Sequence, residues 1–189
     1  MKTQNIMIVG VGGQGSLLAS KLLGRLLTDA GYDVKVSEVH GMSQRGGSVV
    51  TYVKFGDAVH SPIIDKGEAD IILAFESLEA LRALPWLKKG GKMIVNDQQI
   101  NPMPVITGAA EYPENILGKL SAAVDLTAVP ALSLAQKAGN QKAVNVVLIG
   151  VMAKNTEIPY EEWVETIKTT VPAKFLEANL KAFDLGYHL

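Results

Sequence analysis

The sequence predicts an α/β fold: a mostly parallel, Rossmann-like sheet with helices on both faces and a helical C-terminus. Three observations lead to this prediction. Short apolar runs, such as Ile6–Val9 and Ala69–Phe75, alternate with segments in which leucines recur at helical spacing. A glycine-rich turn, Gly10–Gly15, joins the first apolar run to the first helical segment. From Pro159 onward the pattern is helical. Nearly all-apolar strands are typical of sheets that helices cover on both faces.

The first part of the chain predicts one βαβ unit. Ile6–Val9 is a short apolar strand that ends in glycines. Leucines at positions 18, 22 and 26, and at 23 and 27, have helical spacing over residues 14–30, and Gly31 is placed to end that helix. Tyr32–Val36 then indicates a second strand. We therefore expect the first and second strands to form a parallel pair.

Three β-branched or apolar runs in the middle of the chain predict further strands. They are Ser48–Phe55, Ala69–Phe75 and, after a Gly90–Gly91 turn, Lys92–Val95. Leucines at 78, 81 and 84 indicate a helix that stops near Pro85. The expectations that follow are a loop at Asn101–Pro104, an alternating segment around Ala122–Leu126 and a helix over Leu132–Lys137.

The run Ala143–Ala153 is apolar nearly all round, interrupted by Asn145. We interpret it as a helix in preference to a buried strand. Such a helix is buried in its own core or under a partner, so the run is one candidate for an interface.

Two more helices are predicted at the end of the chain. The first begins near Pro159, and two glutamates follow in its first turn, where the helix dipole favours negative charge. The second runs from Pro172 to about Leu185, with Gly186 placed to end it.

Composition restricts the class of protein. A length of 189 residues fits one domain over residues 1–189, and 48% hydrophobic residues exclude a disordered chain. The net charge of -1, with scattered lysines and arginines, predicts no binding to nucleic acid or to an anionic membrane. No run is long enough to cross a bilayer and the N-terminus lacks the design of a signal peptide, so we expect a cytoplasmic protein.

The residue types present also limit the chemistry. The sequence contains no cysteine, which excludes disulfides, a thiol nucleophile and cysteine-ligated iron–sulfur or zinc sites in this chain. Its three histidines, His40, His60 and His188, are too scattered to suggest a metal site. We therefore expect no metal on this chain.

The glycine turn is the first candidate site. Its candidate binding residues are Gly10, Gly12, Gly13, Gln14, Gly15 and Ser16. Glycines let an anion approach the backbone, and the amides at a helix start offer unpaired donors. Three interpretations stay open: contact with a phosphate or other anion, tight strand–helix packing alone, or a dinucleotide site. The last would use Glu38 as the acidic residue near the end of the second strand.

The second candidate site is the loop that follows the second strand. It places Glu38, His40, Gln44 and Arg45 within eight positions, between glycines. Arg45 is suited to a bidentate grip on a carboxylate or phosphate, and His40 to proton transfer near neutral pH. Purely structural interpretations stay open too: His40 bonded to a loop carbonyl, and Glu38 paired with Arg45. Another possible role for Arg45 is that of an interface anchor.

Four stretches together resemble one family. They are Gly10–Gly15, Ser37–Val49, Gly67–Glu76 and the closing Val171–Leu176. They are similar to the β subunit of indolepyruvate:ferredoxin oxidoreductases, itself similar to the γ subunit, or domain III, of the wider 2-oxoacid:ferredoxin oxidoreductases. The resemblance runs from the first strand to the last helix. The block around His40 and Arg45 is much more specific than the glycine turn.

The resemblance implies oxidative decarboxylation of aryl 2-oxoacids, with coenzyme A as co-substrate, to aryl-acetyl-CoA, with electrons passing to ferredoxin. Thiamine diphosphate, magnesium and [4Fe–4S] clusters are then expected on a large α subunit. The sequence agrees, because it lacks cysteines and the Gly-Asp-Gly…Asn signature of a thiamine diphosphate site; Gly56-Asp57-Ala58 does not match it. This chain is expected to complete or gate the partner's active site through His40, Arg45 and Glu38. The alternatives are a free-standing dinucleotide-binding oxidoreductase and a purely structural assembly subunit.

Overall fold

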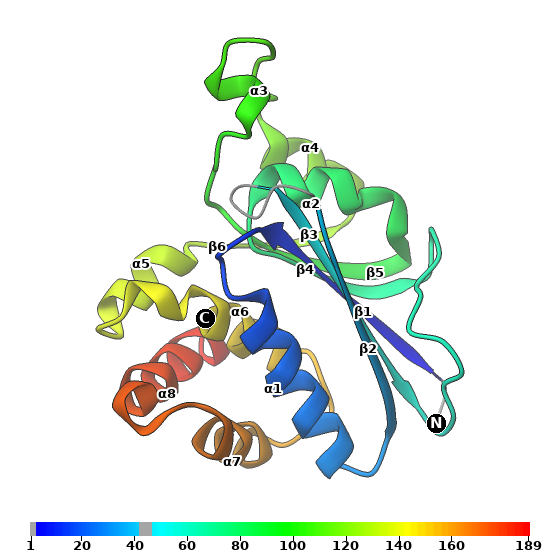
Figure 1. Ribbon diagram of the computed structural model, residues 1–189, viewed down its shortest axis with the longest axis vertical. Helices are drawn as coiled ribbons and strands as arrows, with labels where there is room; N and C mark the ends of the chain where they lie inside the picture. Colours follow the sequence, from blue (N-terminus) through cyan, green and yellow to red (C-terminus); the bar gives the residue numbers. More distant parts are fainter. Residues whose placement is uncertain (1–2, 42–46) are drawn as a thin grey trace.

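The computed structural model describes residues 3–41 and 47–189, which form a six-stranded sheet in the order β2-β3-β1-β4-β5-β6 (Figure 1). β1, β4, β5 and β6 pair in parallel, whereas β3 pairs antiparallel with both β1 and β2. The strands are β1 (Gln4–Val11), β2 (Asp33–His40), β3 (Ser48–Gly56), β4 (Ala69–Ala74), β5 (Leu87–Asn96) and β6 (Asp125–Val129). The predicted fold class, a mostly parallel α/β sheet, is confirmed.

The predicted parallel pairing of the first two strands is wrong, because β3 lies between β1 and β2. β2 and β3 are close in the sequence, and a short connection favours an antiparallel pair. The insertion moves β2 to the edge of the sheet. The burial of the strands agrees with this: β1 is buried over Ile6–Val11, while β2 has no fully buried residue.

Helices cover both faces of this sheet, as predicted. One apolar cluster lies between the sheet and α1, α5, α6, α7 and α8, and a second lies between the sheet and α2 and α4. The bounds on the first face are α1 (Ser16–Asp29), α5 (Ala131–Lys137), α6 (Val144–Ala153), α7 (Tyr160–Thr170) and α8 (Ala173–Tyr187). On the second face they are α2 (Ser77–Ala83) and α4 (Ile116–Ala123). Short 3-10 helices are also present: η1 (Leu84–Trp86) precedes β5, and η2 (Gln141–Ala143) precedes α6.

Three segments differ in detail from their predictions. The expected loop at Asn101–Pro104 contains the start of a short helix, α3 (Met103–Ile106). The alternating segment around Ala122–Leu126 is the end of α4 and the start of β6. β5 begins before the Gly90–Gly91 turn, because an irregularity there, with Gly90 at a φ of 80°, lets the strand continue across it.

The run at 143–153 forms helix α6, as we favoured, and every residue of α6 is buried. The chain itself supplies this burial, mainly through α8 and α5, so of the two alternatives the run is buried in its own core and is not an interface. Among the described residues, no helix is long and apolar enough to cross a membrane.

Two glycines let α6 and α8 pack closely. A Cβ at Gly186 would lie 2.1 Å from Val147 O, and one at Gly150 would lie 2.3 Å from Phe183 O. Gly186 therefore does not end the last helix as predicted. It lies inside α8, where the backbone of α6 leaves no room for a side chain.

We expect Gly186→Ala to lower the free energy of unfolding by about 2–3 kcal/mol, because overpacking at a backbone contact forces the two helices apart. Gly24→Ala is the matched control, since its Cβ would meet Val36 Cγ2 at an ordinary 3.6 Å. That helical substitution should stabilise the protein by about 0.5–1 kcal/mol. Urea unfolding of both variants measures the difference, and equal stabilities would contradict the packing argument.

Candidate functional site

The candidate site lies at the sheet edge where β1, β2, β4 and β5 end and β3 begins. The register places His40 opposite Val49, and Val49 opposite Gly10. The histidine is therefore two strands, or about 10 Å, from the glycine turn in the same row of the sheet. Ligands of open α/β sheets bind at this carboxyl edge.

The Gln14 side chain connects the glycine turn to neighbouring backbone groups through two hydrogen bonds. Its Oε1 accepts a hydrogen bond from the Val11 amide at 2.7 Å, and its Nε2 donates to Phe75 O at 2.9 Å. A Cβ at Gly10 would lie 2.9 Å from that Oε1. Gln14 and Gly10 therefore join the turn to the end of β4, and this use of both residues is structural.

The other glycines of the turn have different surroundings. Gly15 precedes α1 with a φ of 86°, and a Cβ there would lie 2.6 Å from Asn145 Nδ2, which donates to Gly15 O at 3.1 Å. The Gly12 amide donates to Gly47 O at 3.0 Å. Gly13, at a φ of 96°, is exposed, and among the described residues nothing lies within 4 Å of its Cβ position. The turn is therefore packed at Gly10 and Gly15 but open at Gly13, next to the first amides of α1 at Ser16.

Glu38 and His40 are brought together on the α1 side of β2. His40 Nε2 lies 2.8 Å from Glu38 Oε1, and Thr51 Oγ1 donates to Glu38 Oε2 at 2.9 Å. The Glu38 side chain is 13% exposed and that of His40 is 56% exposed. A largely buried carboxylate thus orients an accessible imidazole. The interpretation that His40 bonds a loop carbonyl is replaced by this pair, while Gln44 and Arg45 lie outside the described residues.

β3 separates Glu38 from the glycine turn, which bears on the dinucleotide interpretation. That site needs the acidic residue at the end of the strand beside β1. Here the neighbour of β1 is β3, and both oxygens of Glu38 are engaged by Thr51 and His40. The geometry disfavours a dinucleotide at this turn.

Sequence reasoning missed the residues that hold the two ends of the 41–48 loop. Ser48 Oγ donates to Glu79 Oε2 at 2.5 Å, and Arg82 Nη1 donates to Glu79 Oε1 at 2.6 Å. The Gly41 amide donates to Ser48 O at 3.0 Å. Glu79 lies on α2 and is buried. Glu79 and Arg82 are three residues apart, the spacing of an ordinary ion pair on a helix surface. The sequence therefore gives no indication that Glu79 contacts β3.

Glu76 is a second buried carboxylate at this edge, 1% exposed. Its Oε2 accepts from the Glu79 amide and caps α2, while its Oε1 accepts from the Ile100 amide at 3.0 Å and from Tyr112 Oη at 2.5 Å. Burial, together with this hydrogen bond to Glu76, raises the pKa of the Tyr112 hydroxyl above its usual value. An acidic residue directly before a helix, three positions ahead of another glutamate, was the available sequence signal.

Asn96 connects β5 to the same place. Its Nδ2 donates to Phe75 O at 3.1 Å and to Gln98 Oε1 at 3.2 Å. Gln98 O in turn accepts from the Ser77 amide. The residues directly after β5 therefore take part in the hydrogen bonding of this edge.

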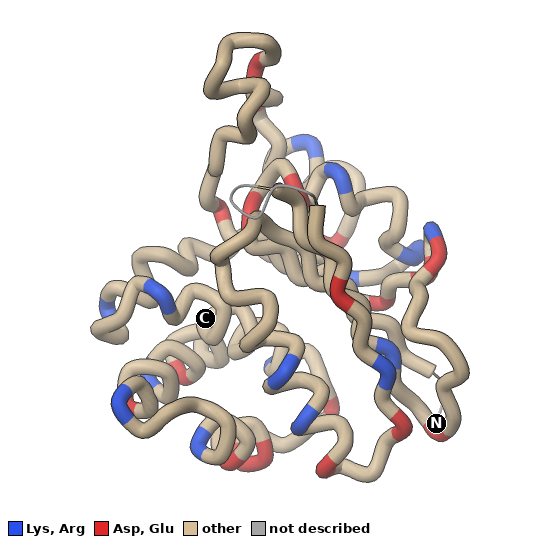
Figure 2. Tube along the Cα trace, viewed as in Figure 1, with Lys and Arg blue, Asp and Glu red and all other residues tan. Residues whose placement is uncertain are grey.

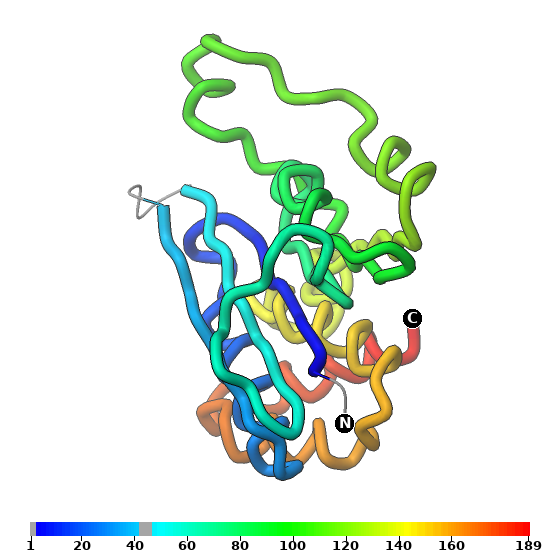
Figure 3. The backbone as a smooth tube through the Cα atoms, turned by 90° about the vertical axis from the view of Figure 1, so that its right-hand side faces the viewer, coloured from blue at the N-terminus to red at the C-terminus, as the bar shows by residue number. Residues whose placement is uncertain are grey.

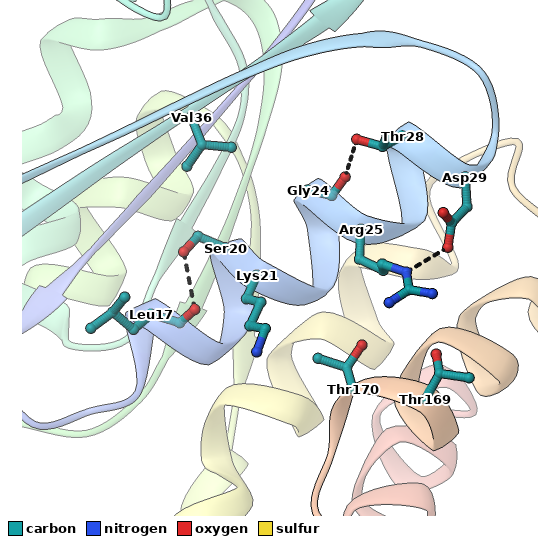
Figure 4. A pocket seen from close by; sticks show the side chains of 10 residues that line it. All are labelled: Leu17, Ser20, Lys21, Gly24, Arg25, Thr28, Asp29, Val36, Thr169 and Thr170. Atoms are coloured by element: carbon teal, nitrogen blue, oxygen red, sulfur yellow. Dashed lines mark hydrogen bonds and ion pairs between the residues drawn. The ribbon is translucent and has the colours of Figure 1, made fainter.

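A groove of about 580 Å³ adjoins the site between α1, β2 and the end of α7 (Figure 4). Leu17 and Val36 form apolar parts of its lining. Polar lining residues are paired locally: Arg25 with Asp29 at 2.8 Å, and Thr28 Oγ1 with Gly24 O at 2.7 Å. None of the candidate site residues that the structure describes lines it, so the groove lies beside the candidate site and is not part of it.

A family model described as pyruvate ferredoxin/flavodoxin oxidoreductase matches residues 5–189. The chain belongs to this family. It is 47% identical to the indolepyruvate oxidoreductase subunit IorB of Pyrococcus horikoshii, over 98% of this chain and 95% of that protein. The resemblance predicted from the four sequence stretches, including the indolepyruvate branch, is therefore confirmed.

Solved structures share the fold. A keto/oxoacid ferredoxin oxidoreductase γ subunit from Geobacter sulfurreducens has a TM-score of 0.73 at 24% identity, and covers 98% of this chain and 96% of that chain. A 2-oxoglutarate:ferredoxin oxidoreductase from Magnetococcus marinus has a TM-score of 0.74 at 18% identity. It covers 100% of this chain but 31% of that chain, so this fold also occurs as one segment of a longer polypeptide.

We expect Gln14→Ala to lower the free energy of unfolding by about 1–3 kcal/mol, because the Val11 amide loses its acceptor in a partly buried place. Gln136→Ala, at an exposed position of α5, is the control and should change stability by less than about 0.5 kcal/mol. Thermal or urea unfolding of the two variants checks this. A Gln14 variant as stable as the control would show that the turn holds its shape without the side chain.

Proposed function

We propose that this chain is the β subunit of a complex that oxidatively decarboxylates aryl 2-oxoacids such as indolepyruvate. The reaction converts one 2-oxoacid, one coenzyme A and two oxidised ferredoxins into aryl-acetyl-CoA, carbon dioxide, two reduced ferredoxins and a proton. The observation that carries the proposal is the Glu38–His40 pair, presented at the carboxyl edge beside the glycine turn in a chain of this family.

The redox and carbanion chemistry belongs, in this proposal, to a large α subunit with thiamine diphosphate, magnesium and [4Fe–4S] clusters. This chain's own residues do not fit those groups, because it has no cysteine to ligate a cluster and no Gly-Asp-Gly…Asn signature. Among the described residues, no group of three or more His, Asp or Glu side chains is arranged to hold a metal ion. We therefore assign this chain no step in electron transfer.

The contribution proposed for this chain is proton transfer and positioning. With Nε2 directed at the Glu38 carboxylate, the neutral imidazole of His40 carries its lone pair on Nδ1, the atom that would accept a proton. Glu38 stabilises the cation that results, as a buried carboxylate does for a histidine base. Arg45, which follows this pair in the sequence, is proposed as an anion contact or interface anchor.

His40→Ala is expected to lower turnover of the assembled complex by about tenfold or more, with the subunits still associated. His188→Ala is the matched control. His188 is also exposed and lies 3.1 Å from a carboxylate, that of Asp184, but it sits at the end of α8 away from the sheet edge. Turnover of the purified complex with indolepyruvate, coenzyme A and ferredoxin is the measurement.

Two outcomes would favour the alternatives. If both histidine variants keep full turnover and intact assembly, the chain is a structural assembly subunit. If the chain never co-purifies with a cluster-bearing large subunit when the two are expressed together, the proposed function fails. Arg45→Ala in the same complex tests the remaining candidate.

We further propose that the open side of the glycine turn contacts an anionic group, with coenzyme A as the first candidate. A ligand that binds the native state raises thermal stability by mass action. We expect coenzyme A, at about a hundred times its dissociation constant, to add roughly 2.7 kcal/mol to the stability of the complex. NAD and FAD are the comparison ligands. Stabilisation by NAD or FAD but not by coenzyme A would revive the dinucleotide interpretation.

A further inference from the structure

Residues 100–112, here called the arm, connect β5 to α4 and project from the body of the protein (Figures 1 and 3). The arm contains α3, whose Met103 and Ile106 are 65% and 66% exposed. Large apolar side chains exposed together on a projecting element are typical of contact sites between proteins.

The arm is fixed at its root by one buried carboxylate. Glu76 Oε1 accepts a hydrogen bond from the amide of Ile100 and another from the hydroxyl of Tyr112, the first and last residues of the arm. A buried carboxylate is costly to desolvate unless it is well bonded, so these two bonds hold the root firmly to the end of β4.

The arm also has internal hydrogen bonds that fix its shape. The Ala109 and Ala110 amides donate to Pro104 O at 2.8 and 3.0 Å, and Thr107 Oγ1 donates to Met103 O at 3.1 Å. A preformed apolar element loses little conformational entropy when it binds. The geometry is therefore that of a preorganised contact element.

The scarcity of charged residues in the arm agrees with its burial in a protein–protein interface. Residues 100–110 include no charged side chain, and Glu111 is the one charged residue of 100–112. Figure 2 shows the arm almost entirely in tan. The core of a protein–protein interface is depleted of charge in the same way, whereas a permanently solvated loop has no reason to avoid it.

We infer that the arm docks onto the large α subunit; this inference rests on the proposed function. The fold occurs in Magnetococcus marinus as 31% of a longer chain, so a domain of this kind can be covalently continuous with its partner domains. The arm leaves β5 at the same carboxyl edge that carries Glu38 and His40. A large subunit that binds the arm therefore lies next to Glu38 and His40, as the proposed shared active site requires. Binding of a second copy of this chain would give these two residues no role.

The test is the affinity of the purified chain for the purified large subunit, with Met103→Asp and Ile106→Asp in the chain. Each variant should raise the dissociation constant by about tenfold or more, since truncating or charging a central apolar contact costs more than 1 kcal/mol. Ile63→Asp is the matched control, because Ile63 is 49% exposed and lies in the loop before β4, away from the arm. It should leave the affinity unchanged.

The outcomes separate the inference from the proposed function. Thermal unfolding first verifies that the arm variants remain folded, as expected for side chains outside both apolar clusters. Wild-type affinity in both arm variants overturns the inference alone. Absence of any association in the wild type overturns the proposed function. Concentration-dependent dimerisation of the isolated chain that Met103→Asp abolishes would assign the arm to a second copy instead.

Discussion

The carbonyl group of Phe75 is the point on which the candidate site depends. It lies at the end of β4 and accepts two side-chain hydrogen bonds, from Gln14 of the glycine turn and from Asn96 of β5. The Phe75 amide also donates to Val9 O of β1. The backbone of one residue is therefore bonded to the ends of β1 and β5 and to the glycine turn, and the turn, the 76–79 segment and the start of the arm are all positioned next to it.

Two buried carboxylates extend this network outward. Glu76 and Glu79 are close in the sequence but serve opposite sides of the edge: Glu76 holds the root of the arm, and Glu79 holds Ser48 at the start of β3. Each is stabilised by several donors, which is the condition under which burial of such a group is tolerated. The two carboxylates thus hold the root of the arm and the start of β3 at the edge that bears the site.

The periodic elements could be predicted because their patterns are local. α6 was predicted because an all-apolar run of this length needs to be buried along its whole surface, and the structure buries every residue of it. The pairing of β2 was predicted wrongly because the residues of a strand do not determine which strand lies beside it. The order here depends on the β2–β3 connection and on the insertion of β3 between β1 and β2. Gly186 was misinterpreted for a related reason, since a glycine that admits another helix is indistinguishable in sequence from a glycine that ends one.

The residues of the candidate site also divide into those whose contacts the sequence could predict and those whose contacts it could not. We expected Glu38 and His40 in the loop after the second strand, but β2 continues through both residues. Alternation along the strand then places them on one face, where they pair. The contacts of Glu76 with Tyr112 and of Glu79 with Ser48 span 36 and 31 residues, and no pattern in the sequence indicates them. The glycine turn lies between these cases. Its conformation was predictable, but the Gln14 side chain and Asn145 give two of its glycines packing roles that only the tertiary fold creates.

The exposure of the pair at the edge fits a shared site. His40 is largely exposed while its Glu38 partner is largely buried, so the chain alone fixes the orientation of the imidazole and leaves the ring in water. In water such a hydrogen-bonded pair is weak, because both groups are well solvated; with solvent excluded, the same geometry is electrostatically stronger. A partner subunit that docked on the arm and covered this edge would supply that exclusion without moving Glu38.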